Sequence, residues 1–116
     1  MVLHPASSIL VVDPDTQVRR LVERILDRAG FEVVGAGNGR EAMSAMSSRG
    51  FDGFVLDAAL DEAFELAASL AARGSRVGII TTAGADLRHR CWPVLQKPFN
   101  PARLLSLLAP LRHERI

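Results

Sequence analysis

Hydrophobic residues along this chain follow two alternating patterns, short continuous runs and longer stretches with helical spacing. The run "SILVVD" (Ser8–Asp13) is short and rich in β-branched residues, as expected for a strand covered on both faces. From Val18 to Ala29, apolar residues recur every three or four positions with charged residues between them, and Gly30 follows. This order predicts a buried strand followed by an amphipathic helix that ends at a glycine.

The same alternation continues along the rest of the chain. Further strands are predicted over Phe31–Ala36, Phe51–Asp57, Arg76–Thr82 and Val94–Gln96, and further helices over Arg40–Arg49 and Asp61–Arg73. The segment Ala83–Trp92 has room for two helical turns at most, so the fourth helix is predicted to be short. Asn100 and Pro101 are typical of the start of a last helix, and Pro110 limits its length.

Five strands alternating with helices predict an α/β fold, because parallel strands need a crossover element between them. Crossovers are right-handed almost without exception, which favours a flavodoxin-like, doubly wound parallel sheet of order 2-1-3-4-5, here with a shortened fourth helix. The chain has 116 residues, of which 48% are hydrophobic. This is enough for one core and too little for two, so we expect a single domain over residues 1–116.

Composition indicates which classes of partner to expect and in which cellular compartment the protein acts. Fourteen Lys and Arg residues against 13 Asp and Glu give a formal net charge of +1, so bulk charge does not indicate a nucleic acid or a membrane surface. The single cysteine, Cys91, cannot form an internal disulfide, which fits a reducing compartment. The N-terminal residues lack the features of a signal peptide or membrane anchor, so we expect a soluble cytoplasmic protein.

Polar residues stand at the predicted carboxyl ends of four strands. Asp13 ends the first strand, Asp57 the third and Thr82 the fourth, and Lys97 follows the fifth. Any one of them would be ordinary at a strand end, but together they lie on the edge where sheets of this kind bind ligands. Two carboxylates suit a hard divalent cation such as Mg²⁺, and a lysine with a hydroxyl suits phosphoryl oxygens.

These residues lie within motifs that resemble the receiver domain of two-component response regulators. The resemblance covers nearly the whole chain, through "ILVVDPDTQVRRLVERIL", "GFEVVGAGNGREAM", "FDGFVLD", "IITTAG" and "LQKPFNPARLL". It implies a signal-transduction protein in a phosphorelay, not an enzyme, whose Asp57 accepts a phosphoryl group from a sensor histidine kinase or a phosphotransfer protein. It further implies that Thr82 hydrogen-bonds the phosphoryl group and that Lys97 pairs with it. Mg²⁺ would be held by Asp13, Asp57 and the backbone carbonyl of Ala59.

The chain departs from the family pattern at three places. Pro14 stands where the family usually has a second acid, so we expect weaker Mg²⁺ binding. Asp15 is either a substitute ligand or, as we favour, the cap of the following helix. Val94 occupies the usual place of an aromatic residue before the lysine, and Trp92 is near but out of register. The loop after Asp57 is also short.

Three classes of function compete on this evidence. The first is a phosphoryl-accepting receiver that signals to a downstream protein partner through a protein surface. The alternative is a degenerate pseudo-receiver that acts as a phosphorylation-independent interaction module. The third, a small flavodoxin-like ligand binder, leaves Lys97 and Pro98 unexplained. No DNA-binding segment is recognised after the domain, so we expect no direct contact with nucleic acid. The sequence leaves open whether the domain forms a homodimer.

Overall fold

The computed structural model, which describes residues 6–84 and 92–112, contains a five-stranded parallel sheet of order β2-β1-β3-β4-β5. The strands are β1 (Ser8–Val12), β2 (Glu32–Ala36), β3 (Gly53–Asp57), β4 (Val77–Thr82) and β5 (Val94–Gln96). The predicted flavodoxin-like order is therefore confirmed. It places β1 and β3 side by side in the middle of the sheet, where the strand order reverses.

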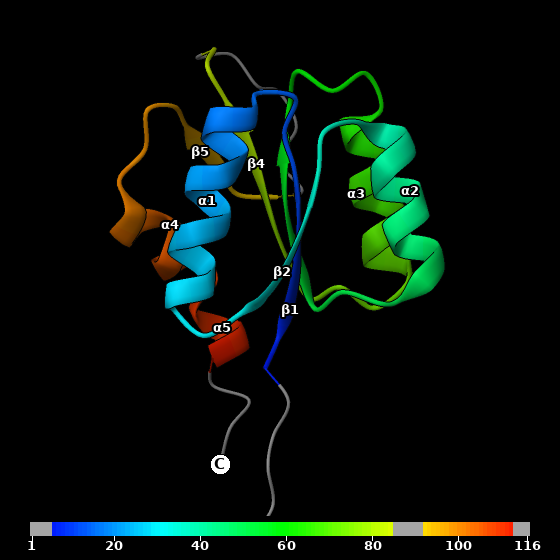
Figure 1. Ribbon diagram of the computed structural model, residues 1–116, viewed down its shortest axis with the longest axis horizontal. Coiled ribbons are helices and arrows are strands. Elements are labelled where there is room, and N and C mark those ends of the chain that lie inside the picture. Colours follow the sequence, from blue (N-terminus) through cyan, green and yellow to red (C-terminus); the bar gives the residue numbers. More distant parts are fainter. Residues whose placement is uncertain (1–5, 85–91, 113–116) are drawn as a thin grey trace, which may run out of the picture.

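Helices cover both faces of the sheet (Figure 1). The helices are α1 (Thr16–Arg28), α2 (Gly39–Ser48), α3 (Ala63–Ala72), α4 (Pro101–Leu107) and the single turn α5 (Ala109–Arg112). Helices α2 and α3 pack on one face, and α1, α4 and α5 pack on the other (Figure 1). Each face encloses its own hydrophobic cluster, so the strands are buried on both sides, as their continuous apolar runs predict.

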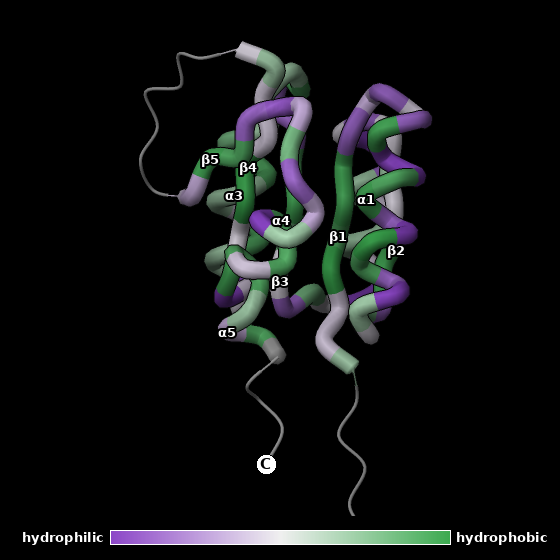
Figure 2. Tube along the Cα trace, turned by 90° about the vertical axis from the view of Figure 1, so that its left-hand side faces the viewer, coloured by the Kyte–Doolittle hydropathy of each residue, from purple (hydrophilic) through white to green (hydrophobic). Residues whose placement is uncertain are grey.

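The strand β1 contributes side chains to both hydrophobic clusters. Leu10 and Val12 point into the cluster under α2 and α3, whereas Ile9 and Val11 point into the cluster under α1, α4 and α5. All four are at most 1% exposed, because successive side chains of a strand alternate between its faces. Figure 2 shows the hydrophobic strand β1 beside helix α1, along whose trace hydrophobic and hydrophilic residues alternate.

The ends of α1 follow from two residues that the sequence singles out. The Asp15 carboxylate accepts hydrogen bonds from the backbone N–H groups of Gln17 (2.9 Å) and Val18 (3.2 Å), so Asp15 is the helix cap. At the other end, Gly30 has a φ of +98°, a conformation that glycine adopts without a steric penalty. The N–H of Phe31 then donates to the carbonyl of Leu26 and directs the chain into β2.

Several boundaries differ from the sequence prediction by one or two residues. Helix α2 begins at Gly39, because the Asn38 side chain accepts from the Glu41 N–H at 2.9 Å and caps it. Helix α3 begins at Ala63 instead of Asp61, after a turn in which the Leu60 N–H donates to the Asp57 carbonyl. Helix α4 ends at Leu107, ahead of Pro110, as predicted.

The predicted shortened fourth helix falls largely on residues 85–91, which lie outside the described part of the chain. Within the described ranges, none of the helices has the length and apolar character needed to cross a bilayer.

Candidate functional site

The carboxyl ends of the central strands gather four polar side chains at one edge of the sheet. Asp13 directly follows β1, Asp57 is the last residue of β3, Thr82 is the last of β4, and Lys97 directly follows β5. The backbone N–H of Lys97 donates to the Thr82 carbonyl at 2.7 Å and so fixes the base of the lysine side chain. Since β5 is two strands away from β3, the lysine must extend across the end of β4 to reach the aspartates.

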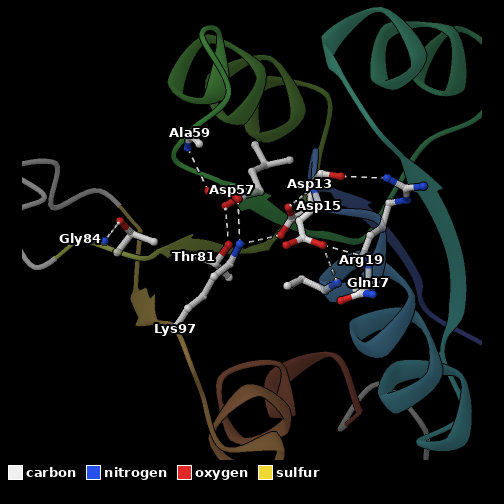
Figure 3. A network of polar contacts seen from close by, with 12 residues as sticks. Asp13, Asp15, Gln17, Arg19, Asp57, Ala59, Thr81, Gly84 and Lys97 are labelled. Carbon is white, nitrogen blue, oxygen red and sulfur yellow. Dashed lines mark hydrogen bonds and ion pairs between the residues drawn. The ribbon is translucent and has the colours of Figure 1, made fainter.

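Lys97 bridges the two aspartates (Figure 3). Its Nζ atom lies 2.8 Å from Oδ2 of Asp13 and 2.8 Å from Oδ2 of Asp57. The side chains are 17% exposed for Lys97, 6% for Asp13 and 10% for Asp57, so the cluster is largely shielded from water. The structure thus brings together three residues that are up to 84 positions apart in sequence.

The second oxygen of each carboxylate is held by a backbone N–H group. Oδ1 of Asp13 accepts from the Asp15 N–H at 2.8 Å, and Oδ1 of Asp57 accepts from the Ala59 N–H at 2.9 Å. In each carboxylate, one oxygen therefore accepts a hydrogen bond from the Lys97 ammonium, and the other accepts one from a backbone N–H group of the loop that follows it. This fixes both side chains in one orientation before any ligand arrives.

The cluster shifts the ionisation of its members. Burial raises the pKa of Asp13 above its ordinary value of 3.8, and the hydrogen bonds from Lys97 and Asp15 offset this only in part. Burial also acts to raise the pKa of Asp57, but the bonds from Lys97 and Ala59 outweigh it and the pKa is lowered. Burial would lower the pKa of Lys97, yet the two carboxylates outweigh it and raise that pKa. At neutral pH the ammonium and the Asp57 carboxylate are both charged.

On acidification, Asp13 should take up a proton before Asp57 does. The pKa of Asp13 lies above 3.8 and that of Asp57 below it, so the pair should titrate in two separate steps. The stability that ionised Asp57 contributes is present above the pKa of the unfolded chain and is lost as the pH falls through its lower folded-state pKa. Carboxyl ¹³C chemical shifts measured against pH would follow both steps, and Asp13→Asn should remove the upper one. An upper step that belongs to Asp57 would contradict this order.

Thr82 lies at the same edge but outside the lysine bridge. Its hydroxyl oxygen accepts a hydrogen bond from the Gly84 N–H at 3.0 Å, which forms a local turn at the end of β4. The hydroxyl hydrogen is not used in that bond, so it can still be donated to a ligand oxygen. Its predicted contact with a phosphoryl group stays a prediction.

One residue near the site was missed by sequence reasoning. The Arg19 guanidinium donates from Nη1 to the backbone carbonyl of Asp13 at 2.9 Å, and its Nε lies 3.8 Å from the Glu23 carboxylate. Arg19 therefore ties the first turns of α1 to the loop that carries Asp13 (Figure 3). Its place among the charged residues of an amphipathic helix gave no signal for this contact.

The region before Lys97 lacks an aromatic side chain at the Val94 position, as the sequence indicates. Val94 is 38% exposed on β5, and its side chain does not replace a buried aromatic. Trp92 instead packs edge-on against Phe54, with ring centroids 6.1 Å apart and an interplanar angle of 67°. Trp92 is thus attached to the core cluster under α2 and α3, on the opposite side of the sheet from α4.

Comparison with known proteins agrees with this geometry. A family model described as "Response regulator receiver domain" matches residues 9–109. The chain belongs to the response regulator receiver family. The receiver domain is 28% identical over 109 residues to the transcriptional regulatory protein SrrA of Staphylococcus aureus, a match that covers 86% of this chain. It spans only 45% of the length of SrrA.

Solved structures give the same assignment. The chemotaxis response regulator CheY4 of Vibrio cholerae is 25% identical, with a TM-score of 0.77 over 91% of this receiver domain and 98% of that chain. The response regulator TrrA of Thermotoga maritima, solved in complex with Mg²⁺–BeF, is 26% identical, with a TM-score of 0.77 over 90% of this chain and 98% of that one. The fold and the two-component family are therefore both shown.

Proposed function

We propose that Asp57 accepts a phosphoryl group from a phosphohistidine of a sensor histidine kinase or phosphotransfer protein, and that the domain passes the signal to a downstream protein. The observation that supports this best is the contact of Lys97 with both Asp57 and Asp13 at the ligand-binding edge of the sheet. In this role the domain is a phosphoacceptor that is consumed once per transfer, not an enzyme that turns over a substrate.

The chemistry of the transfer follows from the charges around Asp57. A carboxylate oxygen of Asp57 forms a bond to phosphorus while the P–N bond of the donor breaks. The electron pair of that bond returns to the imidazole nitrogen, which takes a proton. Because the pKa of Asp57 is lowered, the nucleophile is ionised at neutral pH. The Lys97 ammonium, 2.8 Å from Oδ2, lies where negative charge gathers on the phosphoryl oxygens.

Receiver domains generally bind Mg²⁺ at the phosphorylation site, but the residues of this chain fit that ion poorly. Among the residues that the structure describes, no group of three or more His, Cys, Asp and Glu side chains converges in a way that could hold a metal. Pro14 offers no ligand, and both available carboxylates already bind Lys97. In this proposal Lys97 alone supplies the positive charge beside Asp57.

Intact-mass measurement after incubation with acetyl phosphate tests the proposal. The wild-type domain should gain the mass of one phosphoryl group, and Asp57→Asn should gain none, because an amide oxygen is a poor nucleophile. Asp61→Asn is the matched control, since Asp61 is an exposed acid in the same loop and should leave the adduct unchanged. An adduct of equal yield in Asp57→Asn would refute the assignment of the phosphoacceptor.

A phosphorylation-independent interaction module is the second candidate, and one observation favours it. Asp57 is 7% exposed as a residue, and both of its carboxylate oxygens are engaged in the described structure. A donor must therefore displace part of this network before attack. The absence of any adduct at high donor concentration, in a domain that is folded by its NMR spectrum, would support this candidate over the first.

A further inference from the structure

The contacts around Lys97 bear on which cation the site uses. Its ammonium lies between the two carboxylates, at 2.8 Å from one oxygen of each, which is the place a cation shared by both acids would take. The other oxygens accept backbone N–H groups at 2.8 Å and 2.9 Å. All four carboxylate oxygens therefore already have a hydrogen-bond donor.

A divalent cation would need further oxygen ligands. The family resemblance implies one, the backbone carbonyl of Ala59, and the loop after β1 supplies none. Pro14, directly after Asp13, has no side-chain oxygen. Asp15 is the next acid, but its carboxylate is engaged as the cap of α1, through the N–H groups of Gln17 and Val18. Mg²⁺ loses its water reluctantly and requires near-octahedral oxygen ligands, so two carboxylates that are already paired with an ammonium make a weak site.

Charge leads to the same conclusion. When both acids are ionised, Asp13, Asp57 and Lys97 together carry a net charge of −1 before a ligand binds. A divalent ion would have to displace the ammonium or lie next to it, and two cations side by side repel each other. A third carboxylate at position 14 would change this balance, and the chain lacks it.

We infer that this receiver domain does not use a divalent cation and that the Lys97 ammonium is the cation of its acceptor site. Phosphoryl acceptance at Asp57 would then be independent of Mg²⁺. Only this last statement rests on the proposed function, because cation binding can be measured without a phosphodonor.

The residue to change is Pro14. It is exposed and lines an open cleft of about 480 Å³ beside the site, together with Ala59 and Asp61, so a new side chain there has room. Pro14→Asp would add the missing carboxylate, and Pro14→Ala removes the proline without adding a ligand. Lys97→Met is the second variant. It removes the ammonium and leaves both acids without their cation.

Titration with Mn²⁺ alone, followed by paramagnetic broadening in ¹H–¹⁵N spectra, tests this inference. Mn²⁺ prefers the same oxygen ligands as Mg²⁺. Wild type and Pro14→Ala should show no selective broadening of the Asp15 and Ala59 amides. Pro14→Asp should broaden both, with affinity higher by roughly 10- to 100-fold, the effect that even outer-shell partners of a metal have.

Selective broadening in wild type at the Mn²⁺ concentration that saturates Pro14→Asp would overturn the inference. It would also be overturned if neither Pro14→Asp nor Lys97→Met, each folded by its spectrum, gained a site. The acetyl phosphate reaction repeated in EDTA and in Mg²⁺ should give equal adduct yields, and an adduct that forms only with Mg²⁺ would contradict the inference. No adduct under either condition would refute the proposed function and leave the Mn²⁺ result to decide the cation.

Discussion

Replacing Lys97 with methionine should lower the free energy of unfolding by about 3 kcal/mol, the lower end of the cost of removing one partner of a buried ion pair. The substitution leaves the Asp13 and Asp57 carboxylates largely buried and unpaired beside each other. Asp57→Asn should cost only about 1 kcal/mol, because the ammonium keeps Asp13 and no buried charge loses its partner. The lysine should therefore matter more to stability than the acceptor aspartate.

Urea unfolding followed by the fluorescence of Trp92, the single tryptophan of the chain, measures both values. Lys97→Arg is the control that keeps the charge while changing its shape. Asp15→Ala is the second control, since it should lose about 1 kcal/mol through the helix cap alone. If Lys97→Met were no less stable than Asp57→Asn, the two aspartates would not depend on the lysine in the way the contacts indicate.

Truncation of Phe54 to alanine should destabilise the domain by about 4 kcal/mol, as expected for a large ring in a packed core. Phe54 is 1% exposed in the middle strand β3, and its ring touches Trp92. It also covers Gly78, its register partner on β4, so closely that a Cβ atom there would collide with the ring. The ring thus joins two neighbouring strands and the residue that leads into β5.

A double-mutant cycle separates this packing from general disruption of the core. Gly78→Ala alone should cost about 1 to 3 kcal/mol through overpacking against the ring. Combined with Phe54→Leu, the same alanine should cost much less, because the smaller side chain leaves room for the added methyl group. Thermal unfolding followed by circular dichroism measures all variants. Strictly additive losses would show that the two residues do not interact as the structure places them.

The sequence predicted the sheet and the edge that carries the site because both follow from long, clear patterns. Continuous apolar runs predict strands buried on both faces, and their order leaves one doubly wound topology as the favoured one. Asp13 and Asp57 each end such a run, so topology alone brings them to one edge. Lys97 was placed there by the same reasoning, without any knowledge of its side chain.

The details that the sequence could not supply depend on side-chain direction. Whether Lys97 reaches one aspartate or both is decided by its extension across the end of β4, which no spacing encodes. The bond of Arg19 to the Asp13 carbonyl likewise depends on one choice of side-chain rotamer in the first turns of a helix. The Asn38 cap was recoverable, because an asparagine three residues before Glu41 fits a known cap pattern.

The most direct test of the central claim is to locate the phosphoryl group chemically. Borohydride reduces an acyl phosphate to an alcohol, so treatment after reaction with acetyl phosphate, followed by peptide mass spectrometry, marks the aspartate that carried it. We expect the mark on Asp57 alone, the carboxylate whose pKa is lowered and which Lys97 contacts at 2.8 Å. A mark on Asp13 or Asp61, or a phosphoryl group on any side chain other than Asp57, would contradict the account.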